Sequence, residues 1–293
     1  HGTVTAISGG RPFAITTLRR DVETDGRRAV VAFTEDWSED AQRRDFTLNA
    51  LYADRGGDIF DPVGTGLADA RAGRIVFVGD AHARIAEDYL RILRFFRFHA
   101  WYGRGDADPA GLAACTALKG GLQRLSAERV SKELLKLLAA EDPRGADGEM
   151  AAARALQEVL PEAISLNRFA ALVRIDRDPE LRLSALLPSD PDLAAAMATR
   201  LRLSNAQRER LRLAVGPDPE IAARMSPEAA RRRLYTLGAR GFADRAKLAW
   251  AGHGGDEAGW RNLLALAQDW TAPKFPLTGH DAAAIGVKPG RVL

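Results

Sequence analysis

Short apolar runs separated by turn residues fill the first 80 positions, and this pattern predicts β-strands. The runs are rich in Val, Ile, Thr and Phe and occupy residues 1–7, 12–18, 28–33 and 74–79. Gly9 and Gly10 give a turn signal between the first two runs, and residues 54–62 give another. The stretch 46–54 is apolar enough to be strand or helix. We therefore predict a β-rich amino-terminal part.

From residue 82 onward, apolar positions recur with the period of an α-helix. The longest candidate helix runs from Ala83 to Tyr102 and is apolar nearly all round. Further helices are predicted at residues 126–140, 147–160, 179–187, 190–202, 204–214, 226–238, 241–251 and 256–269. The fold class that follows is α+β, in which a small head with a mixed or antiparallel sheet precedes an all-helical body.

The composition is that of a soluble globular protein. Of 293 residues, 46% are hydrophobic and 28% charged, which excludes a disordered chain. No apolar run reaches the ~18 residues of a membrane span, and we expect no signal peptide. The single cysteine, Cys115, cannot form an internal disulfide, and the five histidines form no zinc-finger cluster. We therefore expect a cytoplasmic protein with no membrane partner. Because the chain opens at His1 on a strand-like run, we also expect a fragment.

Charge alone does not identify a partner. The formal net charge is +3, from 42 Lys and Arg against 39 Asp and Glu. Most basic residues are arginines, which bind phosphates and base edges in a bidentate manner. A genome rich in G and C would produce the same excess of arginine, and composition favours that simpler interpretation. Particular positions must therefore indicate the function.

A first candidate cluster is the run Arg43, Arg44 and Asp45, which precedes an apolar segment. The simpler interpretation from spacing is a solvated loop. In the alternative, the two arginines clamp a phosphate while the aspartate fixes their orientation.

A second candidate cluster repeats a charged residue at every third position: Asp88, Arg91, Arg94 and Arg97. On one helix this row would span about 13 Å at ~1.5 Å per residue, the reach of an extended nucleoside triphosphate. Arginines placed among so many apolar residues need an anionic or hydrogen-bonding partner. In the alternative, Asp88 pairs with Arg91 within the helix and the other arginines extend to solvent.

Asp88 and Arg91 have the chemistry to distinguish nucleotide bases. Cytosine and adenine each present an amino donor beside a ring-nitrogen acceptor, which suits a carboxylate beside a guanidinium. Uracil and guanine place a carbonyl where the amino group would be, opposite the carboxylate, and would be rejected. If the ligand is a nucleotide, the pair therefore predicts selection of C and A.

At these residues the chain resembles the class II CCA-adding tRNA nucleotidyltransferase and bacterial poly(A) polymerase family. The resemblance covers about residues 1–140, and weaker similarity extends through the helical remainder. The segments that carry it are HGTVTAI, ITTLRRDVETDGRRAVVAFTEDW, DAQRRDFTLNALY, DPVGTGLADA, RIVFVGDAHARIAEDYLRILRFFRFHA and LSAERVSKELLKLL.

The resemblance implies a polymerase-β-like head that adds C and A to the tRNA 3′ end without a nucleic-acid template. CTP and ATP would be the substrates, tRNA the partner and Mg²⁺ the cofactor. Carried over by position, Arg43, Arg44 and Asp45 hold the sugar and triphosphate. Asp88 and Arg91 read the base, and Arg94 and Arg97 line the same pocket. The segment 126–138 would buttress the neck, and Gly64–Asp69 would be a flexible loop.

Several departures from the family pattern bear on catalysis. The family's Asp-x-Asp metal pair would lie upstream of His1, so no catalytic or metal-binding residue is assigned here. Ala14 stands where a further acid is usual. We therefore expect this chain to be inactive alone. The alternatives are a poly(A) polymerase of the same family and a non-catalytic fragment that binds nucleotide and RNA.

The chain is predicted to divide into three parts. Residues 1–80 form a partial nucleotidyltransferase head, 81–142 a helical neck with the nucleotide-reading helix, and 143–293 a helical body and tail that binds RNA. Arginines that could track an RNA backbone in the last part are Arg200, Arg202, Arg208, Arg210, Arg212 and Arg231–Arg233. A plain polar helix face explains each stretch equally well. The alternating acids Asp21, Glu23 and Asp25 are expected in a solvated loop, and nothing indicates an oligomeric state.

Overall fold

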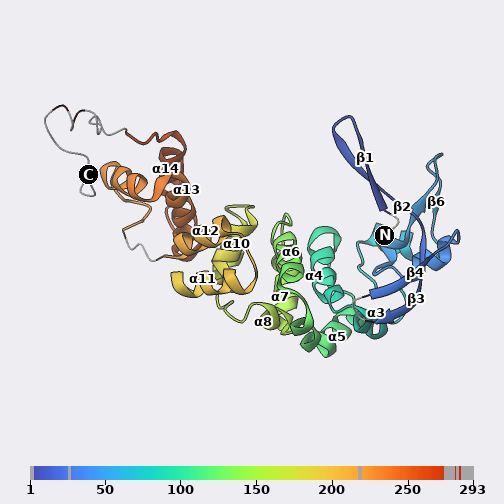
Figure 1. Cartoon of the computed structure of the whole chain (residues 1–293). Helices are drawn as coiled ribbons and strands as arrows, with labels where there is room; N and C mark the ends of the chain where they lie inside the picture. The colour runs from blue at the N-terminus through green and yellow to red at the C-terminus, as the bar shows by residue number, and fades with distance from the viewer. Residues whose placement is uncertain (1–2, 26–27, 217–219, 274–280, 282–283, 285–293) are drawn as a thin grey trace. The chain divides into compact units, whose positions relative to one another are not determined.

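A computed structural model describes residues 3–25, 28–216, 220–273, 281 and 284, with the backbone alone for 20–25 and 28–31. The chain forms two compact units, His1–Pro217 and Asp218–Leu293. Figure 1 shows the strands near the amino terminus and helices along the rest of the chain. Within the described ranges, no helix is both long and apolar enough to cross a membrane.

The chain begins with two antiparallel hairpins. Strands β1 (Thr3–Ser8) and β2 (Arg11–Thr16) pair in the first, and both turn glycines have positive φ. This confirms the turn predicted at Gly9 and Gly10. Strands β3 (Arg19–Asp25) and β4 (Arg28–Phe33) pair in the second. The expectation of a loop over Asp21, Glu23 and Asp25 was therefore wrong, because their backbone pairs with β4.

Short elements follow the hairpins. They are α1 (Trp37–Gln42), a 3-10 helix η1 (Thr47–Ala50), strands β5 (Tyr52–Ala53) and β6 (Ile59–Phe60), and α2 (Gly66–Ala72). The flexible loop expected over Gly64–Asp69 is contradicted, because α2 begins inside it and Asp69 is buried against Thr47, whose hydroxyl donates to it at 2.8 Å. The strand predicted at 74–79 is reduced to an isolated bridge between Phe46 and Phe77.

The long helix predicted from Ala83 to Tyr102 is two helices. Helix α3 (Ala81–Glu87) ends at Asp88, whose backbone is extended at φ −154° and ψ 104°, and α4 (Leu90–Tyr102) begins two residues later. A carboxylate oxygen of Asp88 accepts the backbone N–H of Leu90 at 3.1 Å. A local side-chain bond of this kind competes with helix continuation, which explains why apolar periodicity alone missed the break.

The remainder of the first unit is helical, as predicted. Its elements are α5 (Pro109–Leu118), the 3-10 helix η2 (Lys119–Arg124), α6 (Ala127–Leu138), α7 (Arg144–Ala152), α8 (Ala155–Val159), α9 (Leu166–Val173), α10 (Pro179–Leu186), α11 (Pro191–Arg200) and α12 (Asn205–Val215). Four of the predicted helices match α6, α10, α11 and α12 to within two residues at each end. The segment 147–160 is divided into α7 and α8 by Arg154, which adopts a left-handed conformation.

An aromatic cluster joins the segment after α1 to helix α4. Phe46 packs against Phe77 and Phe98 with ring centroids 5.0 and 5.1 Å apart, and Phe77 stacks on Phe95 at 5.6 Å. All four rings are buried. Aromatic pairs at these separations add about 0.5–1.5 kcal/mol each beyond the burial of their surface. This core fixes the residues before Phe46 against the amino-terminal half of α4.

The second unit contains α13 (Pro227–His253) and α14 (Glu257–Asp269). Gly238 interrupts α13 with φ 70° and ψ 164°, a conformation that favours glycine. This kink separates the two helices predicted at 226–238 and 241–251. Trp260 is buried in the core of this unit with Leu234 and Phe242. The division into head, neck and body stays a prediction.

Candidate functional site

The two clusters singled out in the sequence lie against each other. A terminal nitrogen of Arg84, in α3, donates to the backbone carbonyl of Arg44 at 2.8 Å. Nε of Arg94, in α4, donates to a carboxylate oxygen of Asp45 at 2.6 Å, across 49 residues of sequence. The aromatic core behind them holds both segments in place. The structure therefore places residues 43–45 against α3 and against Arg91 and Arg94 of α4.

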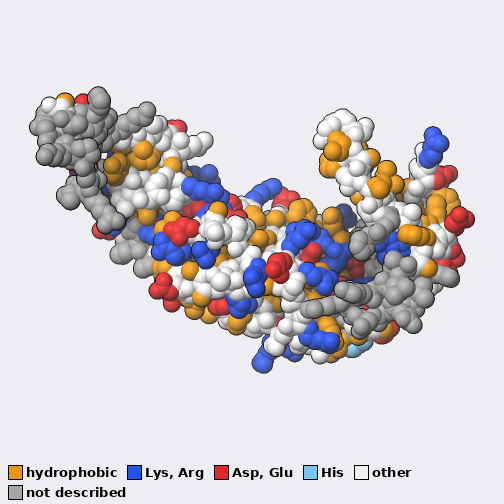
Figure 2. Space-filling view, viewed as in Figure 1, with side chains coloured by type: hydrophobic (Ala, Val, Ile, Leu, Met, Phe, Trp, Pro, Cys, Tyr) orange, Lys and Arg blue, Asp and Glu red, His pale blue; other side chains and the backbone are white. Residues whose placement is uncertain are grey.

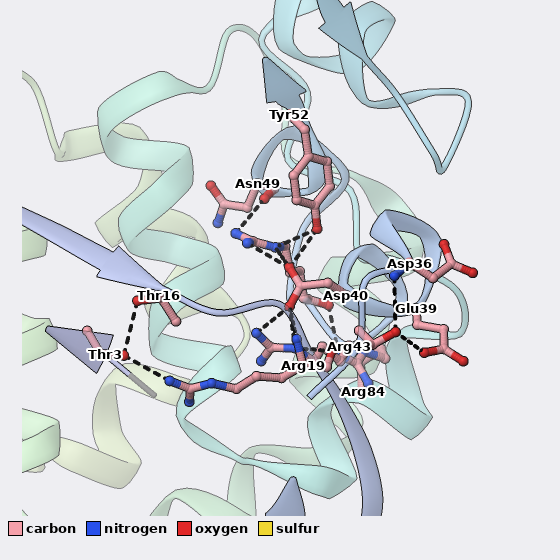
Figure 3. Close-up of polar contacts among 12 residues, drawn as sticks. Thr3, Thr16, Arg19, Asp36, Glu39, Asp40, Arg43, Asn49, Tyr52 and Arg84 are labelled. Carbon is pink, nitrogen blue, oxygen red and sulfur yellow. Dashed lines mark hydrogen bonds and ion pairs between the residues drawn. The ribbon is translucent and has the colours of Figure 1, made fainter. Parts of the chain in front are cut away.

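Asp40, at 1% exposure, organises the first half of the site. Its carboxylate accepts the backbone N–H of Arg19 at 3.1 Å, Nε of Arg43 at 2.8 Å and the Tyr52 hydroxyl at 2.7 Å. A terminal nitrogen of Arg44 also donates to it, at 2.8 Å. Figure 3 shows the Asp40 carboxylate beside Arg19, Arg43 and Tyr52. One buried acid thus orients both arginines of the first cluster.

The donors around Asp40 determine its ionisation. Burial opposes the charged form, but the bonds from Tyr52, Arg44, Arg43 and Arg19 outweigh it and lower the pKa of Asp40 to about 2. Burial and the bond to this carboxylate raise the pKa of Tyr52 to about 12. Asp40 is therefore a fixed negative charge, and Tyr52 a fixed hydroxyl donor, at neutral pH.

Asp45 does not orient the arginines that precede it, which corrects the expectation from sequence. Its carboxylate, 8% exposed, accepts from Arg94 and, at 2.8 Å, from the side-chain amide of Asn49. The ion pair between Arg94 and Asp45 measures 2.5 Å. Asp45 therefore links the first cluster to α4 and leaves the orientation of Arg43 and Arg44 to Asp40.

Arg91 pairs with Glu87, not with Asp88. A terminal nitrogen of Arg91 donates to Glu87 at 2.6 Å and to the backbone carbonyl of Arg84 at 2.6 Å. The same carboxylate accepts from Arg84, which is 9% exposed. The alternative in which Asp88 pairs with Arg91 inside one helix is therefore wrong, because Asp88 lies at the break between α3 and α4.

Asp88 is held by a residue of α6. A terminal nitrogen of Arg129 donates to its Oδ2 at 2.7 Å, while its Oδ1 accepts from Leu90. The side chains are partly open to solvent, at 30% for Asp88 and 44% for Arg129. The carboxylate therefore stands at the edge of the site with both oxygens engaged and surface left for a ligand.

Arg97 also turns toward α6. Its Nε donates to Glu133 at 2.6 Å, with side-chain exposures of 13% and 6%. The guanidinium lies 4.3 Å from the ring centroid of Phe98, a cation–π distance. This buried pair places Arg97 between α4 and α6. Arg94 contacts the same ring, at 5.3 Å, but reaches the other way to Asp45.

The site carries more positive than negative charge. Its ion pairs join five guanidinium groups to three carboxylates: Arg43 and Arg44 to Asp40, Arg84 and Arg91 to Glu87, and Arg94 to Asp45. An anionic ligand would balance the remaining excess of two charges.

The described residues do not fit the expected magnesium ion. Among them, no three side chains of His, Cys, Asp or Glu come together as a metal site would require. The carboxylates of the site are each bound by an arginine instead: Asp40, Asp45, Glu87, Asp88 and Glu133. Among the residues that the structure describes, we therefore assign none to a metal.

Several residues that build the site were not predicted. They are Asp40, Arg84, Glu87, Arg129 and Glu133. The spacing of Asp40 from the two arginines, three and four residues, is the i,i+3 and i,i+4 pattern of a helical ion pair and could have indicated its role. The spacing of Glu87 from Arg91 is a second such signal. The contacts to α6 span 36 and 41 residues and have no local signal.

The arginines proposed to track RNA mostly have acidic partners. Arg200 pairs with Glu162 at 2.7 Å, and Arg212 pairs with Glu209 at 2.7 Å. Arg210 binds the carboxylate of Asp178 at 2.8 Å. Figure 2 shows Lys and Arg side chains interspersed with Asp and Glu over the helices of the first unit. These contacts favour the alternative in which the arginines stabilise helix faces.

Two family models match parts of the chain. Residues 1–76 match the poly A polymerase head domain, and residues 107–166 match the probable RNA- and SrmB-binding site of polymerase A. Among curated proteins, the mitochondrial CCA tRNA nucleotidyltransferase 1 of Mus musculus is 33% identical over 309 residues, covering 100% of this chain and 68% of that protein. The Homo sapiens protein of the same name is 32% identical over 320 residues, with the same two coverages.

Solved structures share the fold. The Bacillus stearothermophilus CCA-adding enzyme in complex with CTP matches with a TM-score of 0.70 and 24% identity over 99% of this chain and 73% of that chain. The Thermotoga maritima CCA-adding enzyme complexed with tRNA matches with a TM-score of 0.65 and 18% identity, covering 99% and 71% of the two chains. The α+β architecture is therefore that of these structures.

Proposed function

Because the chain belongs to the CCA tRNA nucleotidyltransferase family, we propose that its site binds CTP and ATP and adds C and A to the 3′ end of tRNA without a nucleic-acid template. The observation that carries this proposal is that residues 43–45 contact Arg91 and Arg94 of the charged row. The sequence assigns the first segment to the sugar and triphosphate and the second to the base. We propose that a single nucleotide contacts both segments.

Arg43 and Arg44 are the residues we propose for the triphosphate. A guanidinium offers five N–H donors. Asp40 binds the guanidinium groups of both Arg43 and Arg44, and its single negative charge leaves these two arginines with a net positive charge. We propose that Arg94 stabilises the same pocket through Asp45, and that Arg97 shapes its far wall through Glu133. The triphosphate is common to CTP and ATP, so this half of the site serves both.

Asp88 and Arg91 are the residues we propose for base selection. Asp88 would accept from the amino group of cytosine or adenine through its remaining lone pairs. One terminal nitrogen of Arg91 donates to Glu87 and to the Arg84 carbonyl, and the other donates to the Arg43 carbonyl at 3.4 Å. We propose that its Nε–H donates to the ring nitrogen. Both hydrogen bonds are lost with UTP or GTP, which leaves the carboxylate opposite a carbonyl.

Binding measurements with two variants test this division of labour. Arg44→Ala is expected to weaken CTP and ATP alike, by about 1.5–3 kcal/mol, because it removes a charged hydrogen-bonding partner of the triphosphate. Asp88→Ala is expected to reduce the preference for CTP over UTP, by about 1–3 kcal/mol. Dissociation constants of all four nucleotides, measured by titration calorimetry, report both effects. Arg71→Ala, an exposed residue of α2, is the control. Loss of CTP binding alone in Arg44→Ala would contradict the assignment.

The acceptor and the transfer step are also proposals. We propose tRNA as the acceptor and Mg²⁺ as the ion for transfer, with residues 1–80 as head, 81–142 as neck and 143–293 as RNA-binding body and tail. Incorporation of labelled CMP and AMP into tRNA without its CCA end tests this, and addition of AMP alone would favour the alternative, a poly(A) polymerase. We expect no incorporation by these 293 residues without further metal-binding acids. Incorporation would contradict that expectation.

For the compartment, we propose the cytoplasm. Cys115 is buried and free, which fits a reducing environment. The mouse and human relatives are named as mitochondrial proteins, so the mitochondrial matrix is the alternative.

A further inference from the structure

At the break between α3 and α4, packing fixes the position of the backbone. The direction of the Asp88 side chain is set separately. The Tyr89 ring packs against Gly121 of η2, where an added Cβ would lie 2.0 Å from a ring atom. The Arg124 guanidinium lies over the same ring, 5.4 Å from its centroid. The backbone on either side of Asp88 therefore has a defined position, and the direction of its carboxylate depends on side-chain contacts.

Helix α6 supplies the side-chain contact to Asp88, as one of a series of hydrogen bonds. Three bonds join it to the segment beginning at the break: Arg129 to Asp88 at 2.7 Å, Glu133 to Arg97 at 2.6 Å, and the carbonyl of Lys136 to the Trp101 indole at 2.7 Å. Residue numbers rise together on both sides, so α4 and α6 run in the same direction. Two of these three hydrogen bonds do not involve Arg129, and they hold α6 beside α4 independently of it.

We propose that Arg129 is a positioning residue for base selection, an inference that rests on the proposed function of Asp88. Arg129 holds Oδ2 while the Leu90 N–H holds Oδ1, so the carboxylate plane is set from two sides. Rotation about the Asp88 side chain would move both acceptor oxygens away from the amino group of a bound base. With Arg129 in place, that rotation is prevented and the carboxylate meets the base in one orientation.

The exposure of the Arg129–Asp88 pair distinguishes a role in orienting Asp88 from a role in stabilising the fold. The pair is partly exposed, and such pairs contribute little to folding stability, about 0.2–1 kcal/mol. The bond from Arg97 to Glu133 and the bond from the Trp101 indole to the Lys136 carbonyl keep α4 and α6 together without it. Removing Arg129 is therefore expected to change nucleotide preference much more than stability.

The experiment compares dissociation constants for CTP and UTP in four variants of the chain. Arg129→Ala is expected to lower the CTP preference about three- to fivefold, by weakening CTP and leaving UTP unchanged. Arg129→Lys keeps a donor in reach and is expected to restore most of the preference. Lys132→Ala, an exposed residue one turn along the same helix, is the matched control. Melting temperatures of all variants are expected to agree closely.

Asp88→Ala separates failure of this inference from failure of the proposed function. If Asp88→Ala lowers the CTP preference and Arg129→Ala does not, Arg129 has no positioning role and the inference is overturned alone. If Asp88→Ala leaves the preference unchanged, the proposed base-reading pair is wrong and the inference falls with it. Tighter CTP binding by Arg129→Ala would also overturn the inference, because it would show that Arg129 competes with the base for Asp88.

Discussion

Two buried carboxylates show how strongly the surroundings of one residue decide its charge. Asp40 and Asp147 are each 1% exposed. Asp40 receives four donors and ionises readily, whereas neither oxygen of Asp147 has a hydrogen-bond partner in the described structure. Burial raises the pKa of Asp147 to about 7. The first acid therefore stabilises the fold at neutral pH, and the second opposes it.

The first prediction concerns Asp147. Its pKa is 3.8 when unfolded and about 7 when folded, so the folded protein binds a proton that the unfolded chain releases within that interval. Stability should therefore fall as pH rises from 4 to 7, by up to about 1.4 kcal/mol per pH unit, and level off above. Asp147→Asn removes the titration and should flatten this decline. Urea unfolding at pH 5, 6, 7 and 8 measures it, with Asp106→Asn, an exposed acid, as control. Equal slopes in wild type and Asp147→Asn would contradict the prediction.

The charged residues of the site were predictable, but their partners were only partly so. The sequence indicates Arg43, Arg44 and the row beginning at Asp88 because residue type and spacing are local properties. Their orientation is set by Asp40, by Glu87 and by residues of α6. The partner of Asp88 lies 41 residues away, and no periodicity in either segment encodes that contact. The charged residues of the site could therefore be predicted from the sequence. Their hydrogen-bond partners depend on tertiary packing and could be predicted only in part.

At the scale of elements, helices with strong end signals were predicted well. Helix α12 begins at a capping box between Ser204 and Gln207, and α10 and α11 each begin with proline after an aspartate cap. The failures lie where side chains override apolar periodicity. Asp88 interrupts α3 and α4, and polar residues 19–25 form β3 because β4 offers a paired edge. Strand propensity depends on such partners more than helix propensity does.

Arg182 leads to a prediction about how the helices of the first unit are held together. Fully buried in α10, it donates to the carbonyls of Leu138 and Ala140 at 2.7 and 2.6 Å and to that of Asp176 at 2.8 Å. These carbonyls lie at and just beyond the carboxyl ends of α6 and α9, which lack intrahelical donors. Arg182→Met keeps the volume and removes the donors. We expect a loss of about 3 kcal/mol or more in the free energy of unfolding.

Denaturant unfolding measures this loss against a nearby control. Arg177 is 74% exposed and pairs with an exposed Glu141 at 2.6 Å. Arg177→Met should therefore change the free energy of unfolding by no more than about 0.5 kcal/mol. Similar effects of the two substitutions would show that the carbonyls find other partners when Arg182 is removed.

At the scale of the whole molecule, every residue of the candidate site belongs to one compact unit. The segments 40–52, 84–97 and 129–133 all lie within His1–Pro217, and their bonds are made inside that unit. The unit Asp218–Leu293 has its own core around Trp260. Nucleotide binding should therefore not depend on the second unit.

A shortened chain of residues 1–217 tests this expectation. We expect its dissociation constant for CTP to agree with that of the longer chain within about twofold, measured by the same calorimetric titration. Circular dichroism establishes that the shortened chain is folded. A folded chain that had lost more than tenfold in affinity would show that the site requires residues beyond 217.

The parallel course of α4 and α6 has an electrostatic consequence. Each helix carries about half a positive charge at its amino-terminal end and half a negative charge at its carboxyl-terminal end, and parallel helices place like ends together. Asp88 lies at the positive end of α4, one arginine side chain away from that of α6. At the opposite end, Lys136 occupies the last turn of α6, and the Trp101 indole donates to its carbonyl. The partial positive charges of the two helix ends therefore add at this edge of the site instead of cancelling, as they would between antiparallel helices.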